Sequence, residues 1–204
     1  LLEFNGSSLV NQYNEKNSSL QIITSSGWIR IGGVDFDDDN NLWVTNSQAE
    51  NPLSKLSPSG VWSGFSIPNL PTSIMSGKIL CVSNGQKWIQ LRNEGLIVAQ
   101  EENKEMISKK MGTMDGLPSQ TVNCFVEDSE GVVWVGTSQG LCVFYSPNEI
   151  FNNIKKLLII GAKDRNHAFH TPIFSNNNDK NLTNSRVVVL RKFNQKKTYV
   201  NCSS

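Results

Sequence analysis

The chain has 204 residues, of which 38% are hydrophobic, enough for one or two ordinary domains. It contains no run of about 20 apolar residues, so the sequence predicts no membrane span in this chain. The formal net charge of +1 conceals a division: residues 1–151 carry 9 Lys and Arg against 16 Asp and Glu, whereas residues 152–204 carry 10 against 2. We therefore predict two parts that meet near Phe151.

A tryptophan-centred unit recurs along the first part. The opening LLEFNG, residues 1–6, matches the end of such a unit, and complete copies surround Trp43, Trp88 and Trp134, which are 45 and 46 residues apart. A polar turn precedes each Trp and an apolar residue follows it. A period near 45 is typical of a four-stranded propeller blade. We interpret Leu1 as the start of a truncated unit.

The best-preserved copy, residues 115–151, predicts three strands, at 121–127, 132–137 and 141–145. On the first of them, alternation would place Val122, Cys124 and Val126 on one face. The strands are apolar on both faces, which indicates sheets stacked on either side. We expect structural roles for Asp128, for a core Trp134, for Gly136 beside a neighbouring backbone, and for Thr137 at the turn amides.

Residues 127–141, EDSEGVVWVGTSQGL, resemble the repeat of the two-component regulator propeller family. The pattern is an Asp, a Gly-containing turn, Trp, an apolar residue, Gly-Thr, a short turn and Gly-Leu; here it falls on Asp128, Gly131, Trp134, Val135, Gly136-Thr137 and Gly140-Leu141. In the two earlier copies Thr45-Asn46 and Gln90-Leu91 replace Gly-Thr. More narrowly, residues 1–153 resemble the propeller component of the type IX secretion system of certain Gram-negative bacteria.

Three functions stay open on this resemblance. It implies, first, a non-enzymatic component of type IX secretion at the cell surface, with protein partners and a role in handling anionic lipopolysaccharide. The second is a periplasmic sensor propeller of a hybrid two-component regulator that recognises a glycan. The third, a propeller-fold lyase or hydrolase, is the weakest, because no cluster of acids, His or Tyr recurs at the repeat ends. The resemblance implies an extracytoplasmic location, and we do not expect nucleic acid as a partner.

The sequence predicts no catalytic, cofactor-binding or metal-binding residue. Asp37, Asp39 and Asn41 have the spacing of an EF-hand calcium loop. However, Leu42 stands where that loop needs Gly, and Gln48 stands where it needs Glu. We therefore interpret this segment as a hairpin turn before a repeat Trp.

The histidines and cysteines give no stronger site. Asp164, His167 and His170 are three residues apart, but Pro172 follows closely and no helix cap precedes them, so we expect plain surface. No pair of cysteines has CxxC spacing. We expect buried free thiols at the strand positions Cys81, Cys124 and Cys142, with a Cys124–Cys142 disulfide left open, and we assign no role to Cys202.

Residues 152–204 form a basic, Asn-rich tail for which three explanations stay open: sequence read out of frame, a genuine basic arm, or an unrecognised module. A further repeat would bring a Trp near position 179, where the sequence is SNNNDKN. The one convincing strand candidate is RVVVLRKF at 186–193. We therefore expect a poorly ordered tail that completes no blade.

Together these patterns predict an all-β fold. Residues 1–151 are expected to form a partial β-propeller of about three four-stranded antiparallel blades, followed by the tail at 152–204. Because typical propellers close with four to eight blades, the outer blades should expose apolar faces.

Overall fold

The structure, a computed structural model, describes residues 1–23, 25–103 and 105–151 with their side chains, and the backbone of four strands beyond them. The chain divides into two compact units, Leu1–Pro147 and Asn148–Ser204. Among the described residues, no helix has the length and apolar character that crossing a membrane requires. The regular structure of the described chain is almost entirely β, as the sequence predicts.

The first unit begins with an antiparallel hairpin of β1 (Leu2–Asn5) and β2 (Ser8–Gln12). The side chains of both strands are exposed. The chain after β2 fixes the hairpin, because the Tyr13 ring meets the Trp62 ring edge to face, with centroids 5.2 Å apart.

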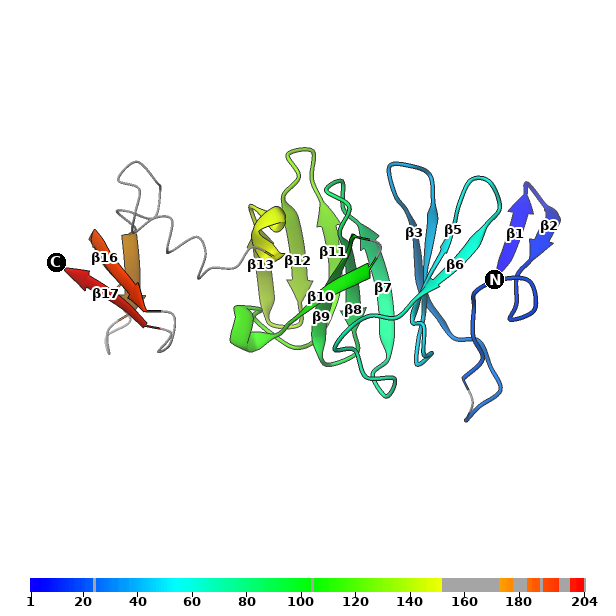
Figure 1. Ribbon diagram of the computed structural model, residues 1–204, viewed down its shortest axis with the longest axis horizontal. Helices are drawn as coiled ribbons and strands as arrows, with labels where there is room; N and C mark the ends of the chain where they lie inside the picture. Colours follow the sequence, from blue (N-terminus) through cyan, green and yellow to red (C-terminus); the bar gives the residue numbers. More distant parts are fainter. Residues whose placement is uncertain are drawn as a thin grey trace. The chain divides into compact units, whose positions relative to one another are not determined.

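Two four-stranded antiparallel sheets follow, each with its strands in sequence order (Figure 1). The first sheet consists of β3 (Ile31–Phe36), β4 (Leu42–Asn46), β5 (Leu53–Leu56) and β6 (Trp62–Phe65). The second sheet consists of β7 (Ser76–Cys81), β8 (Lys87–Leu91), β9 (Gly95–Glu102) and β10 (Glu105–Met111). Tight turns connect most of the strands, and Asn40 (φ 60°) and Gly85 (φ 88°) adopt the left-handed conformation that these turns need.

The third sheet has three strands: β11 (Val122–Glu127), β12 (Val133–Thr137) and β13 (Gly140–Phe144). They agree with the predicted strands to within one residue at each end. The repeat predicts a fourth strand, which this sheet lacks among the described residues. Short 3-10 helices, η1 (Thr113–Asp115) and η2 (Pro147–Phe151), precede and follow it.

The predicted alternation of side chains along β11 is wrong. The register with β12 shifts between Val122 and Cys124, which marks a β-bulge. A bulge inserts one extra residue and changes which face the following side chains occupy. Val122 is accordingly buried, whereas Cys124 and Val126 are exposed.

Within the first unit, the sheets are held together by tryptophans on their second strands. Trp43 of β4 belongs to a buried cluster with Ile79, Ile89 and further apolar residues of the second sheet. Trp88 of β8 packs edge to face on Phe144 of β13, with ring centroids 4.9 Å apart. Each of these indoles therefore points to the sheet that follows in sequence, which confirms the predicted stack of sheets.

Trp134 of β12 is the exception, because it is only half-buried. Val126 and Leu141, on the same face of the third sheet, are 57% and 59% exposed. Val133 and Val135, on the opposite face, are fully buried. The prediction that Trp134 is a core residue is therefore wrong, and the face that carries it is the exposed apolar face expected of an outer blade.

Glycines determine how closely neighbouring strands approach. A Cβ on Gly33 of β3 would lie 2.8 Å from the Cα of Lys78 in β7, so only glycine fits between these two strands. A Cβ on Gly136 would lie 2.7 Å from the Sγ of Cys124. Gly136 thus makes room for a side chain of the adjacent strand, not for a neighbouring backbone as predicted.

In the second unit, the described strands form two antiparallel pairs: β14 (Ile173–Asn177) with β15 (Thr183–Val187), and β16 (Val189–Asn194) with β17 (Tyr199–Ser203). The predicted strand at 186–193 is therefore divided between β15 and β16. The expectations for Asp164, His167 and His170, and for the order of the tail, concern residues outside those that the structure describes.

Candidate functional site

The repeat Asp holds the turn and the indole together in the first and third sheets. The Trp43 indole donates to Asp37 Oδ2 at 2.7 Å, and the Trp134 indole donates to Asp128 Oδ2 at the same distance. The other oxygen of each carboxylate accepts the backbone amides two and four residues further on, at 2.9–3.1 Å. The repeat Asp is thus a structural residue, as predicted.

These bonds also set the acidity of the two carboxyl groups. The Trp134 indole, followed by a backbone amide, lowers the pKa of Asp128. Burial acts to raise the pKa of Asp37, but the donors from Trp43 and Asn41 outweigh it, and the pKa is lowered. Both groups are held as carboxylates, which is the form that accepts these bonds.

In the second sheet, a residue other than Asp accepts the hydrogen bond of the indole. Val82 occupies the position of the repeat Asp, and the Trp88 indole donates instead to Gln86 Oε1 at 3.1 Å. Gln86 is 1% exposed, and its amide group donates to the carbonyl oxygen of Pro147 at 2.9 Å. The Gln side chain therefore replaces the carboxylate and also ties this sheet to the start of η2.

In the copies that lack the Gly-Thr pair, the second residue after the Trp makes a hydrogen bond to the next sheet. Thr45 Oγ1 donates to the carbonyl oxygen of Gly77, in the next sheet, at 2.7 Å. At the same repeat position Gln90 donates to the carbonyl oxygen of Val122, again in the next sheet. The third copy has Gly136 there and no side-chain donor. The departures from the family pattern thus supply hydrogen bonds between sheets.

Two more acidic residues also connect sheets. Asp35 Oδ2 accepts the backbone amide of Cys81 at 2.7 Å. Glu127 accepts both the amide and the hydroxyl of Ser83, at 2.9 and 2.5 Å. These carboxylates lie on the first strands of their sheets, where they accept hydrogen bonds from a neighbouring sheet.

Cys81, Cys124 and Cys142 are free thiols, as predicted, but they are not buried as predicted. Cys81 and Cys142 are half-buried and Cys124 is exposed. Cys124 and Cys142 lie on β11 and β13, with β12 between them, so the disulfide left open from the sequence does not form. Burial raises the pKa of the Cys81 thiol to about 12.

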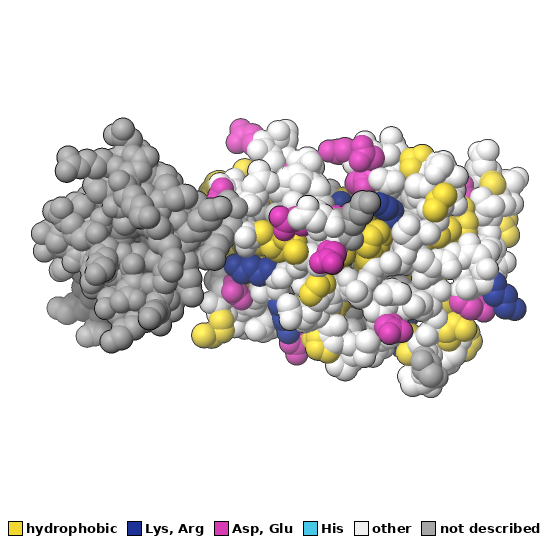
Figure 2. Space-filling model, viewed as in Figure 1, with side chains coloured by type: hydrophobic (Ala, Val, Ile, Leu, Met, Phe, Trp, Pro, Cys, Tyr) yellow, Lys and Arg dark blue, Asp and Glu magenta, His cyan; other side chains and the backbone are white. Residues whose placement is uncertain are grey.

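The candidate calcium residues form a turn, as predicted. Asp37 uses both carboxylate oxygens for donors from Asp39, Asn41 and Trp43. Among the residues with described side chains, no group of three or more His, Cys, Asp or Glu residues is placed to hold a metal. Acidic side chains gather at the tips of the β3–β4 and β11–β12 turns, at the upper edge of Figure 2; the exposed residues there include Asp38, Asp39 and Glu130.

A polar hollow of about 290 Å³ lies between the first and second sheets. The ammonium groups of Lys55 and Lys87 lie 5.2 and 4.8 Å from the centroid of the Trp43 ring. Lys87 is 4% exposed and donates to the Gly85 carbonyl oxygen at 3.0 Å, while Lys55 lies 3.9 Å from Glu101. Both ammonium groups thus have partners among the residues that line the hollow, and we interpret this cluster as structural.

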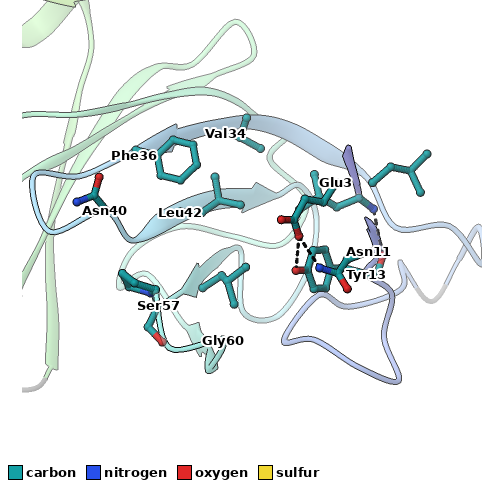
Figure 3. Close-up of a pocket in the computed structure, with 13 residues that line it drawn as sticks. Glu3, Asn11, Tyr13, Val34, Phe36, Asn40, Leu42, Ser57 and Gly60 are labelled. Carbon is teal, nitrogen blue, oxygen red and sulfur yellow. Dashed lines mark hydrogen bonds between the residues drawn. The ribbon is translucent and has the colours of Figure 1, made fainter. Parts of the chain in front are cut away.

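A groove of about 470 Å³ lies between the β1–β2 hairpin and the first sheet (Figure 3). One wall is apolar and includes Val34, Phe36 and Leu42. Val34 is 48% exposed and Phe36 is 61% exposed. The opposite wall is polar, because Glu3 accepts hydrogen bonds from Asn11 at 2.8 Å and from the Tyr13 hydroxyl at 2.7 Å.

Comparison with family models supports the repeat. The model described as Two component regulator propeller matches residues 116–139, the part of the chain that contains β11, β12 and the turn between them. A search of curated proteins gives no match.

Comparison with solved structures supports the fold. PorZ, an essential bacterial surface component of the type-IX secretion system of Porphyromonas gingivalis, is similar with a TM-score of 0.63 and 15% identity. The match covers 93% of this chain and 26% of PorZ, so the chain spans about a quarter of the length of that protein. At this identity, the similarity establishes the propeller fold alone.

Two further solved structures are more distant. The extracellular domain of BT4673 from B. thetaiotaomicron, assigned to a hybrid two component system, matches 86% of this chain and 24% of its own, with 15% identity and a TM-score of 0.42. Virginiamycin B lyase from Staphylococcus aureus matches 81% of this chain and 58% of its own, with 11% identity and the same TM-score.

Proposed function

We propose that this chain is a non-enzymatic propeller of the type IX secretion kind, which acts at the cell surface by binding other molecules. The observation that carries the proposal is that the acids of the repeat are engaged in structure. Asp37 and Asp128 hold indoles, and Asp35 and Glu127 join neighbouring sheets. The similarity to PorZ supports the choice among propeller proteins.

The proposed ligand is an anionic lipopolysaccharide, and the basic part of the chain is its proposed binding region. Residues 152–204 carry 10 Lys and Arg against 2 Asp and Glu, so their charge complements an anionic glycan, whereas residues 1–151 are net acidic. The test is binding of the full chain to immobilised anionic lipopolysaccharide at increasing salt. Binding should weaken with salt, because screening reduces attraction between charges.

A matched pair of variants makes this test specific. Arg191→Glu with Lys192→Glu should reduce binding strongly. Lys109→Glu with Lys110→Glu makes the same charge change in the first unit and should have little effect. Equal losses in the two variants, or binding that salt does not alter, would contradict the proposed binding region.

The second candidate is a periplasmic sensor propeller that recognises a neutral glycan, and the family match at residues 116–139 favours it. A ligand that binds only the folded state raises the melting temperature. In this case a neutral oligosaccharide should raise the melting temperature of the full chain, and anionic lipopolysaccharide should not. The opposite pattern supports the secretion component.

A further inference from the structure

We propose that a cleft between loops at one end of the first sheet is a binding site for a neutral carbohydrate, held through its hydroxyl groups. The cleft has a volume of about 500 Å³ and lies between residues 15–22, the turn after β4, and Thr72 in the connection from β6 to β7. Such a site rests on the second candidate function, the recognition of a neutral glycan, and gives that function a place in the molecule.

Hydrogen bonds between the loops fix the walls of this loop cleft. The backbone amide of Asn51 donates to Gln21 Oε1 at 2.8 Å, and the backbone amide of Gln21 donates to Asn46 Oδ1 at 2.5 Å. Leu20 and Ala49 also line the cleft and anchor the two loops, since they are only 2% and 3% exposed. The loop cleft is therefore preformed, as small-molecule sites usually are.

The protein orients the amide groups of the two glutamines that line the loop cleft. Gln21 Oε1 accepts the backbone amide of Asn51, and Gln48 Oε1 accepts the guanidinium group of Arg30. Because both of these partners can only donate, each glutamine must turn its oxygen toward the partner. No hydrogen bond joins either glutamine NH2 group to another described residue, so both groups remain available as donors.

The backbone at Gln48 is in a conformation that does not suit glutamine. Gln48 has a φ of 62°, and Asn93, which lies at the same position of the second repeat, has a φ of 57°. The left-handed region favours Gly and Asn, and the other non-glycine residues with a positive φ in the described chain are all Asn. Backbone strain of this kind concentrates at functional sites. The strain therefore singles out Gln48 among the residues of the loop cleft.

The loop cleft also supplies acceptors and an apolar contact. Glu15 and Glu50 line it as exposed carboxylates, and neither forms a hydrogen bond or ion pair with another described residue. Ile22, which is 40% exposed, can contact the C–H face of a sugar ring. Since a hydroxyl group both donates and accepts, neighbouring sugar hydroxyls can use the amide donors and the carboxylate acceptors together. The two carboxylates would repel an anionic glycan, so the expected ligand is neutral.

Isothermal titration calorimetry of the full chain tests the proposal. The probes are neutral trisaccharides, namely maltotriose, cellotriose, xylotriose, mannotriose and laminaritriose. At least one of them should bind with a Kd below about 1 mM. Trigalacturonic acid, which is anionic, should not compete with it.

Isosteric variants locate the site. Gln48→Glu and, separately, Gln21→Glu keep the oxygen that the protein uses but replace the NH2 donor with an acceptor. Each should weaken binding of the trisaccharide by at least about 10-fold. Gln139→Glu is the matched control, because Gln139, like Gln48, lies five residues after its repeat Trp but belongs to the third sheet, and this variant should bind as the parent does. Far-UV circular dichroism identifies any variant that unfolds, and the remaining cleft variant then decides.

The outcomes separate the site from the candidate function. If a trisaccharide binds but both cleft variants bind it as the parent does, the glycan is recognised elsewhere, so the site is refuted and the second candidate function stands. If no trisaccharide binds, both are refuted. An equal loss in Gln139→Glu also overturns the site, because it would reflect the added charge and not the lost donor.

Discussion

Truncation of Trp88 to Ala should be the most damaging change among the three repeat tryptophans. Trp88 is fully buried, and truncating a core aromatic costs about 3–5 kcal/mol. Its indole also donates to the buried Gln86 Oε1, and an acceptor left without its donor adds about 1 kcal/mol. The expected loss of about 4–6 kcal/mol is a large part of the stability of an ordinary domain.

The equivalent change at Trp134 should cost much less. Trp134 is half-buried, and its indole partner, Asp128, can bind water in its absence. Less apolar surface is therefore exposed by the truncation than at Trp88, which corresponds to a loss of about 1–3 kcal/mol. The difference in stability between the two Trp→Ala variants thus shows which of the two tryptophans is covered by a following sheet.

Urea unfolding followed by far-UV circular dichroism is the suitable assay, because it does not depend on indole fluorescence. Trp28→Ala is the control: Trp28 is 75% exposed and its loss should change stability by about 0.5 kcal/mol or less. If Trp88→Ala fails to fold, Trp88→Phe retains most of the apolar surface and should still be less stable than the parent. Equal losses at Trp88 and Trp134 would refute the reasoning.

The remaining predictions concern single contacts. Thr45→Val should destabilise by about 0.5–1.5 kcal/mol in the same assay, because a buried hydrogen bond between sheets is lost. Maleimide at pH 8, followed by peptide mass mapping, should label the exposed Cys124 well before Cys81, whose pKa is raised to about 12. The pKa of Asp128 is lowered from its ordinary value of 3.8, so its contribution to stability is present above that pH and is lost as the pH falls below it. Asp128→Asn should therefore make the urea midpoint less sensitive to pH between about 4 and 2. Millimolar calcium should leave the melting temperature unchanged, because the oxygens of Asp37 already accept internal donors, and a rise of several degrees would contradict this.

Local patterns were enough to predict much of the fold. The strands of the third sheet follow from apolar runs divided by turns at Gly131 and Gly140, two positions where a positive φ is needed, and the structure has φ values of 77° and 144° there. The structural role of Asp128 follows in the same way, because its partner Trp134 is only six residues away. Interactions of this kind lie within a short stretch of sequence.

Features that depend on distant contacts could not be predicted. The bulge after Val122 arises from register with β12, and no residue type in β11 marks it. The second bond of Gln86, to the carbonyl oxygen of Pro147, joins residues 61 positions apart. The groove was missed because its exposed wall, with Val34 and Phe36, has the alternation of an ordinary covered strand. A sequence shows which side chains are apolar, but not which of them lack a neighbour.

The three indoles are held by different hydrogen bonds, and this difference affects the order in which the sheets fold. In the first and third sheets, Asp and Trp are six residues apart, so the bond forms when a short loop closes, an event of low contact order. In the second sheet, the indole bonds to Gln86 only two residues away, but the Gln86 amide is itself held by Pro147, 61 residues away, and closing that long loop costs more chain entropy. The Asp-containing turns of the first and third sheets can therefore form early and independently. The support of Trp88 in the second sheet is complete only after the third sheet has packed against it. Kinetic φ-values should accordingly be higher for Asp128→Asn than for Gln86→Ala.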